Sequence, residues 1–126
     1  MTSIFLIDDD IPLRNIYKEL LELKGYDVIA SASNGKEALE IFKSLPKKPD
    51  AIIMDHRMPI MSGLEATQEI LKISEDSIII FASADESVKN SALSMGAMSF
   101  KVKPFTYKEL ISNIDKALNV RIPKIS

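Results

Sequence analysis

The chain has 126 residues, 46% hydrophobic and 27% charged, with a formal net charge of −2 and no cysteine. This composition indicates one globular domain with a core, and it does not favour general attraction to nucleic acid or to anionic membranes. The lack of cysteine excludes disulfides, thiol nucleophiles and cysteine-ligated metals, and a single histidine, His56, excludes a multi-histidine metal site.

Five short apolar runs alternate with longer amphipathic stretches along the chain. The runs are rich in β-branched residues and predict strands at 3–7, 27–32, 51–54, 77–82 and 98–102. Between and after them, apolar residues repeat at spacings of three and four, which predicts helices at 13–24, 38–45, 64–71, 88–93 and 110–118.

The predicted helix boundaries carry their own signals. Asp10 can cap the first helix, with Pro12 just inside it, and Gly25 ends that helix. The segments 34–37 and 106–109 both have the spacing of a capping box. These signals support the alternating order of strands and helices.

Strand–helix alternation predicts a parallel sheet covered by helices on both faces. The runs 4–7, 51–54 and 77–82 are almost continuously apolar, as interior parallel strands are, whereas 27–32 and 98–102 suit the edges of the sheet. The expected fold is therefore an α/β, doubly wound, five-stranded parallel sheet of order 2-1-3-4-5, flavodoxin-like, with five βα units. We expect one domain over residues 1–120 and a C-terminal tail over 121–126.

Polar residues follow the ends of four of the predicted strands. Asp8 and Asp9 follow the first strand, Asp55 the third, Ser83 the fourth and Lys103 the fifth. All of these ends lie on one edge of a parallel sheet, where the order 2-1-3-4-5 has its ligand-binding switch point. Clustered carboxylates need a compensating cation, and Mg²⁺ prefers oxygen ligands. A free carboxylate beside such an ion, a lysine and a hydroxyl predicts phosphoryl transfer to a carboxylate nucleophile.

Four motifs fall at those strand ends in the right order: LIDDD (6–10), IIMDHRMPIMSG (52–63), FASAD (81–85) and FKVKPF (100–105). With them, the sequence resembles a response-regulator receiver domain of two-component signalling, of the chemotaxis-regulator type. The resemblance extends from Ile4 to about Leu118.

The resemblance implies roles for the acidic residues. Asp55 is the expected phosphoacceptor, and Asp8, Asp9 and Asp55, with the backbone carbonyl of Arg57, are the expected site of Mg²⁺, for which Mn²⁺ can substitute. Arg57 and Asp85 occupy positions that tune dephosphorylation in the family. We expect them to pair across the mouth of the site and to slow dephosphorylation.

It also implies roles for residues of the last two strands. Ser83, Ala84 and Lys103 are expected to bind the phosphoryl group, Ser83 and Phe100 to act as switch residues, and Lys103–Pro104 to be a cis peptide. Ser83 stands in place of the commoner threonine, and Phe100 lacks a tyrosine hydroxyl.

By this resemblance, the protein is a phosphorylation-dependent switch rather than an enzyme, and it catalyses only its own Mg²⁺-dependent phosphorylation and dephosphorylation. Its expected partners are a sensor histidine kinase or phosphotransfer protein and an unidentified target, without direct nucleic-acid or membrane binding. The resemblance also allows a phosphorylation-dependent dimer that forms through the fourth helix, the fifth strand and the fifth helix. The output face is predicted to include Val88, Lys89, Ala92, Met95, Phe100, Lys101 and Tyr107.

The location is expected to be cytoplasmic. No apolar run reaches the roughly 18 residues of a membrane span, and the N-terminal segment reaches its acids too soon for a signal peptide.

Three rival functions remain open at this point. A degraded receiver could act only as an interaction module, which the intact acids and lysine argue against. A flavodoxin-type flavin protein would need a Ser/Thr/Gly-rich loop where 8–12 reads DDDIP. A haloacid-dehalogenase-type phosphatase would need an acid two residues after its nucleophile, where Arg57 stands.

For some of these residues, a purely structural role would also explain the sequence. Asp8 and Asp9 could form only an acidic turn that caps a helix, and Ser83 could be only a buried hydroxyl bonded to the backbone. Phe100 could be only an edge-strand aromatic residue.

Overall fold

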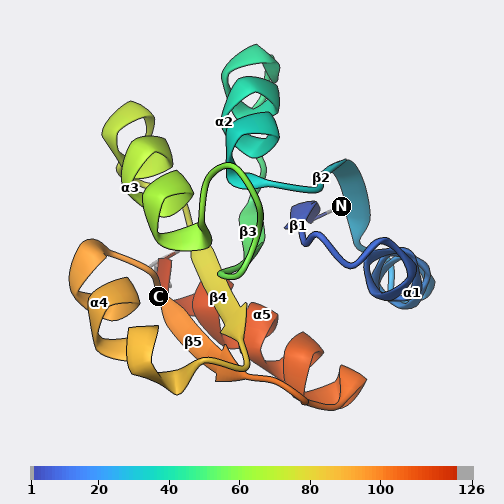
Figure 1. Ribbon diagram of the computed structural model, residues 1–126. Helices are drawn as coiled ribbons and strands as arrows, with labels where there is room; N and C mark the ends of the chain where they lie inside the picture. Colours follow the sequence, from blue (N-terminus) through green and yellow to red (C-terminus); the bar gives the residue numbers. More distant parts are fainter. Residues whose placement is uncertain (1, 122–126) are drawn as a thin grey trace.

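The structure, a computed structural model, describes residues 2–121 and forms one five-stranded parallel sheet with helices on both faces (Figure 1). The strands stand in the order β2-β1-β3-β4-β5, which confirms the predicted fold. The elements are β1 (Ser3–Ile7), α1 (Ile11–Leu23), β2 (Asp27–Ala32), α2 (Gly35–Ser44), β3 (Ala51–Asp55), α3 (Gly63–Ile73), β4 (Ile79–Ser83), the 3₁₀ turn η1 (Glu86–Val88), α4 (Lys89–Met95), β5 (Ser99–Val102) and α5 (Tyr107–Arg121).

Alternate residues of the inner strands face two separate cores. On β1, Phe5 and Ile7 face the core formed with α2, α3 and α4, while Ile4 and Leu6 face the one formed with α1 and α5. All four are buried, because interior strands of a covered parallel sheet have no solvent face. The continuous apolar runs of the sequence therefore reflect two cores, one on each side of the sheet.

The helix caps follow the sequence signals, with one difference. The side chain of Asp10 accepts a hydrogen bond from Leu13 N (3.1 Å) at the start of α1, as predicted. At α2, Asn34 caps Glu37 N (2.8 Å), but the Glu37 carboxylate accepts from Ser33 N (2.9 Å) instead of closing the box on Asn34. The cap thus also orders the turn between β2 and α2.

The C-terminal end of the chain is described only in part. Helix α5 continues through Arg121, and the rest of the predicted tail lies outside the described residues, so the domain boundary stays a prediction. Within residues 2–121, no helix combines the length and the apolar character that crossing a membrane requires.

Candidate functional site

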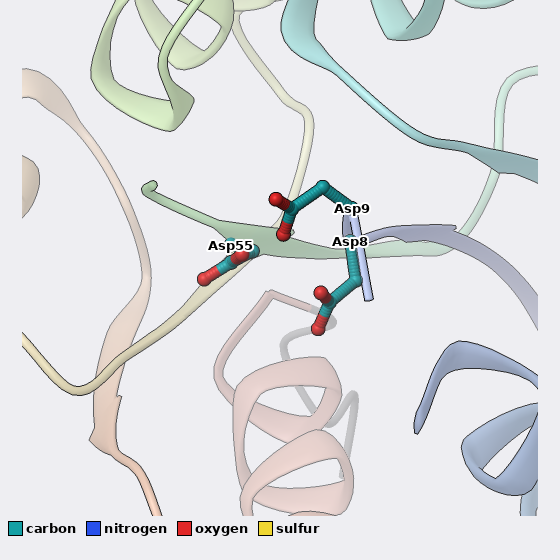
Figure 2. Close-up of side chains that lie close together, drawn as sticks. All are labelled: Asp8, Asp9 and Asp55. Atoms are coloured by element: carbon teal, nitrogen blue, oxygen red, sulfur yellow. The ribbon is translucent and has the colours of Figure 1, made fainter. Parts of the chain in front are cut away.

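Three carboxylates meet at one edge of the sheet (Figure 2). Strands β1 and β3 pair side by side in parallel, so the residues that close them, Asp8, Asp9 and Asp55, arrive at the same edge. One carboxylate oxygen from each lies within 4.8 Å of the others. Asp8 and Asp55 are buried (4% and 8% exposed), whereas Asp9 is exposed. The sequence-based prediction that these acids are neighbours is confirmed.

Lys103 supplies the positive charge of this cluster. Its Nζ lies 2.9 Å from Asp8 Oδ2 and 3.5 Å from Asp55 Oδ1. Its backbone N–H donates to the carbonyl of Ser83 (3.0 Å), which ties the loop after β5 to the end of β4. Burial opposes the charge on this ammonium, but the hydrogen bond to Asp8 and the charges of both acids outweigh it and raise the Lys103 pKa. The Lys103–Pro104 peptide is cis, as predicted.

The electrostatic environment of Asp55 disfavours its charge. Burial is the largest cause and Asp8 adds repulsion, while Lys103 and the His56 backbone N–H stabilise the carboxylate, so that the pKa of Asp55 rises to about 6. Asp55 is therefore mostly ionised at neutral pH, as a nucleophile must be, but holds its charge at a cost in free energy.

That cost predicts the effect of Asp55→Asn. Since the folded pKa is about 6 and the unfolded value about 3.8, stability should fall as the pH rises through this window. Above pH 6 and without divalent cations, Asp55→Asn should be more stable than the wild type by roughly 3 kcal/mol, because each pKa unit corresponds to about 1.4 kcal/mol. Urea unfolding at pH 7.5 and at pH 4 measures this difference, which should vanish at the lower pH. The exposed Asp27→Asn is the control, and equal stability of Asp55→Asn and wild type at pH 7.5 would contradict the account.

Strand β4 brings a hydroxyl to the same edge. Ser83 ends β4, is 1% exposed, and its Oγ accepts a hydrogen bond from Asp85 N (3.0 Å). Asp55 stands opposite Ala82 in the β3–β4 pair, so Ser83 lies one residue beyond it, followed by the exposed Ala84. The predicted phosphoryl-binding residues are thus grouped at the carboxyl ends of adjacent strands.

Arg57 and Asp85 pair, as predicted from the sequence. Arg57 Nη2 lies 3.3 Å from Asp85 Oδ2, and the pair joins the loop after β3 to the loop after β4. Hydrogen bonds from Ser87 to Asp85, and then the Arg57 guanidinium, lower the pKa of the Asp85 carboxyl. The pair lies at the protein surface, since the Arg57 side chain is largely exposed to solvent.

An aromatic row crosses the sheet beside the acids. The ring of His56 lies 5.9 Å from Phe81, and Phe81 stacks on the half-buried Phe100 at 5.8 Å. Phe100 on the edge strand therefore already contacts the core in this structure. A change in its position on activation stays a prediction.

Two residues assigned to the output face do not lie on it. Ala92 is fully buried against the core, because it is on the inner side of α4. The Tyr107 hydroxyl donates to the carbonyl of Leu20 (2.8 Å), which places this side chain against α1 instead of beside β5. The prediction was wrong for both, because the resemblance indicates which elements form the face but not which way each side chain on them points.

Two residues that support the site were not singled out from the sequence. Arg14 Nη1 donates to Ser33 Oγ (2.8 Å) and to the carbonyl of Asp8 (3.4 Å), and thereby joins α1, the β1 end and the β2 end. Gly63 N donates to the His56 carbonyl (3.0 Å), and a Cβ at Gly63 would lie 2.0 Å from the Asp55 carbonyl oxygen. The glycine that closes IIMDHRMPIMSG was the available signal for the second contact.

Comparison with known proteins agrees with this geometry. Residues 4–115 match the family model of the response regulator receiver domain. The chain is 36% identical over 115 residues to the chemotaxis protein CheY of Thermotoga maritima, covering 90% of this chain and 94% of that protein. It is 37% identical over 118 residues to the chemotaxis protein CheY of Bacillus subtilis, covering 92% and 97%.

Solved structures show the same likeness. A response regulator receiver domain protein from Clostridium thermocellum superposes with a TM-score of 0.89 at 32% identity, covering 96% of this chain and 97% of that one. The response regulator protein TrrA from Thermotoga maritima, solved in complex with Mg²⁺-BeF, gives a TM-score of 0.83 at 36% identity, covering 93% and 99%.

Proposed function

Because this chain belongs to the response regulator receiver domain family, we propose that it is a phosphorylation-controlled switch in which Asp55 accepts the phosphoryl group. Domains of this family are signalling proteins of two-component systems rather than catalytic enzymes. The observation that carries the proposal is the meeting of three carboxylates with the Lys103 ammonium at one sheet edge.

The acidic cluster suits a hard divalent cation. Oxygens from Asp8, Asp9 and Asp55 within 4.8 Å of one another can approach one ion with small side-chain adjustments, and such a donor set of carboxylates fits Mg²⁺. The carbonyl of Arg57 is the further ligand we assign. Bound Mg²⁺ would neutralise charge on the acids and on the phosphoryl oxygens. The relative TrrA was solved with Mg²⁺-BeF, which supports the assignment.

The residues of the chain have distinct parts in the transfer. The ionised Asp55 attacks phosphorus, so that an oxygen–phosphorus bond forms while the phosphorus–nitrogen bond to a phosphohistidine donor breaks. We assign the holding of the phosphoryl oxygens to the Lys103 ammonium, the Ser83 hydroxyl and the Ala84 backbone N–H. Because Lys103 now contacts Asp8 and Asp55, its contacts would redistribute when the phosphoryl group arrives.

The charge change at Asp55 can spread through the elements that carry these groups. Ser83 leads directly into the loop before α4, and Lys103 directly follows β5. We assign the output to the surface of α4, β5 and α5, as a population shift between two states. The donor is a sensor histidine kinase or a phosphotransfer protein, and a cytoplasmic location fits this role.

The Arg57–Asp85 pair predicts slow loss of the phosphoryl group. The pair joins the loops after β3 and β4, and we expect it to restrict the approach of water to the aspartyl phosphate. Arg57→Ala should therefore speed dephosphorylation by about threefold to tenfold, or roughly 1 kcal/mol in the barrier. The decay of phosphoprotein after removal of the donor, followed by mass, measures it. Arg57→Lys is the control that keeps the charge, and an unchanged or slower decay in Arg57→Ala would contradict this role.

Intact mass tests the proposed function directly. The protein is incubated with acetyl phosphate in the presence or absence of Mg²⁺, beside Asp55→Ala, and mass is the readout because the chain has no tryptophan. One added phosphoryl group, dependent on Mg²⁺ and absent from Asp55→Ala, is expected. No adduct, together with no Mg²⁺-dependent stabilisation, would indicate a constitutive interaction module instead.

A further inference from the structure

Charge is distributed unevenly along the chain. Residues 88–126 contain seven lysines and arginines but only two acids, a formal charge of +5, whereas residues 1–87 contain nine against sixteen, or −7. The fold gathers most of the basic part in α4, β5 and α5, which lie together in the lower part of Figure 1. The protein, although acidic as a whole, therefore has one basic side, formed by α4, β5 and α5, which attracts negatively charged partners.

The centre of the basic side is a ridge on α5, formed by Lys108, Ser112 and Lys116. They recur every four residues and are exposed, so they stand in line on one face of the helix. A groove of about 330 Å³ lies on the α1 side of the ridge, and Lys24, Tyr107, Ile111, Asp115 and Asn119 also line it. Within residues 2–121, Lys24, Lys108 and Lys116 form no ion pair.

The two acids of this region are already engaged. Glu109 pairs with Lys101 at 3.2 Å, and Asp115 accepts a hydrogen bond from the Tyr26 hydroxyl. Glu109 is thus paired with a cation, whereas Asp115 stands on the groove wall against three exposed lysines, Lys24, Lys108 and Lys116, which leaves the groove a formal charge of +2. This combination suits carboxylates from outside the chain.

The groove also has fixed walls. On the inner side of α5, Leu110 and Ile114 are buried against the sheet. Tyr107 is hydrogen-bonded to the carbonyl of Leu20, and Asp115 is hydrogen-bonded to the hydroxyl of Tyr26. Although α5 also belongs to the proposed output surface, this side of the helix is held by hydrogen bonds to Leu20 and Tyr26, which lie outside that surface, so the affinity of the groove should not depend on phosphorylation.

The chemistry favours an acidic protein segment over two other occupants. A second copy related by a two-fold axis would place the lysines of one ridge against the same lysines of the other, and like charges repel. A nucleic acid duplex presents charge over a long surface and would also meet the acidic remainder of the molecule. A peptide can place carboxylates on the ridge and an apolar side chain on Tyr107 and Ile111, which line the groove.

We propose that the groove between α1 and the α5 ridge binds an acidic, amphipathic segment of another protein, whether or not Asp55 is phosphorylated. Spacing supports an extended segment: consecutive ridge residues rise about 6 Å along the helix, and alternate residues of an extended chain are about 6.6 Å apart. Glutamates at alternate positions can then follow the ridge. The site is separate from the acidic cluster and does not require the proposed phosphoryl transfer.

A fluorescein-labelled peptide that repeats Glu-Ser-Glu-Leu is the probe, and its anisotropy is titrated with the full chain. We expect binding that weakens at high salt and is unchanged by acetyl phosphate and Mg²⁺. Lys108→Glu/Lys116→Glu should weaken it by about tenfold or more, corresponding to 1.4 kcal/mol. The matched control is Lys36→Glu/Lys43→Glu, which makes the same change of charge on exposed positions of α2 and should retain the affinity. Circular dichroism checks that both variants fold.

Any of five results would overturn the proposal. The first four are no binding of the peptide, equal weakening in the control variant, tighter binding of duplex DNA through Lys108 and Lys116, or a dimer of the wild-type chain that Lys108→Glu/Lys116→Glu dissolves. The fifth is a set of NMR amide shifts on peptide binding that avoids residues 107–119. None of these results affects the intact-mass test of Asp55, so the two proposals fail independently.

Discussion

Gly63→Ala is expected to lower the free energy of unfolding by about 3 kcal/mol and to disable phosphorylation together with it. A Cβ at this position would lie 2.0 Å from the Asp55 carbonyl oxygen and 2.9 Å from the His56 Cα, and both are backbone atoms that a side-chain rotation cannot move. Relief of the contact must shift the end of β3, and with it the Asp55 carboxylate. Even a displacement near 1 Å can cost about 100-fold in rate.

Urea unfolding and the rate of mass gain with acetyl phosphate measure both effects of Gly63→Ala. Gly25→Ala is the matched control: Gly25 has a φ of +90°, but a Cβ there meets no atom within 4 Å. It should cost about 1 kcal/mol through backbone strain alone and leave the rate unchanged. A Gly63→Ala protein with wild-type stability and wild-type rate would show that the loop after β3 can move without affecting Asp55.

The sequence predicts the sheet well because burial leaves a direct pattern in it. Runs such as 51–54 are apolar throughout, since both faces of an interior strand are covered, and this placed β1, β3 and β4 inside. The start of β4 was less well predicted. Ile78 is buried and reads as strand, but Ser77 N donates to the Ser74 carbonyl (3.1 Å), so the chain is still in a turn there.

The acidic cluster was predictable for a topological reason. Parallel strands end at one edge, so polar residues at the ends of β1 and β3 had to meet, whatever the side-chain details. Contacts between helices and that edge were not predictable. Arg14 reaches Ser33 only because of how α1 lies beside the end of β2, and neither spacing nor hydropathy records that.

Lys103→Met is expected to lower both the stability of the protein and the rate of its phosphorylation. It leaves Asp8 and Asp55, both buried, without the ammonium that lies 2.9 and 3.5 Å away. Breaking a buried pair costs 3–5 kcal/mol, and since this lysine retains some exposure we expect about 2 kcal/mol at pH 7.5 without Mg²⁺. Phosphorylation by acetyl phosphate should slow by about 100-fold, because a donor to the developing charge is lost.

A double-mutant cycle separates this electrostatic effect from lost packing. If Lys103 acts by compensating Asp55, Lys103→Met should cost less in the Asp55→Asn background, where one buried charge is already gone. Saturating Mg²⁺ should likewise restore much of the stability of Lys103→Met, because the ion replaces the missing positive charge. The exposed Lys18→Met on α1 controls for loss of a lysine as such and should change stability by under about 0.5 kcal/mol. Equal cost of Lys103→Met in both backgrounds, with no response to Mg²⁺, would mean that Lys103 supports the fold through its aliphatic chain and not through its charge.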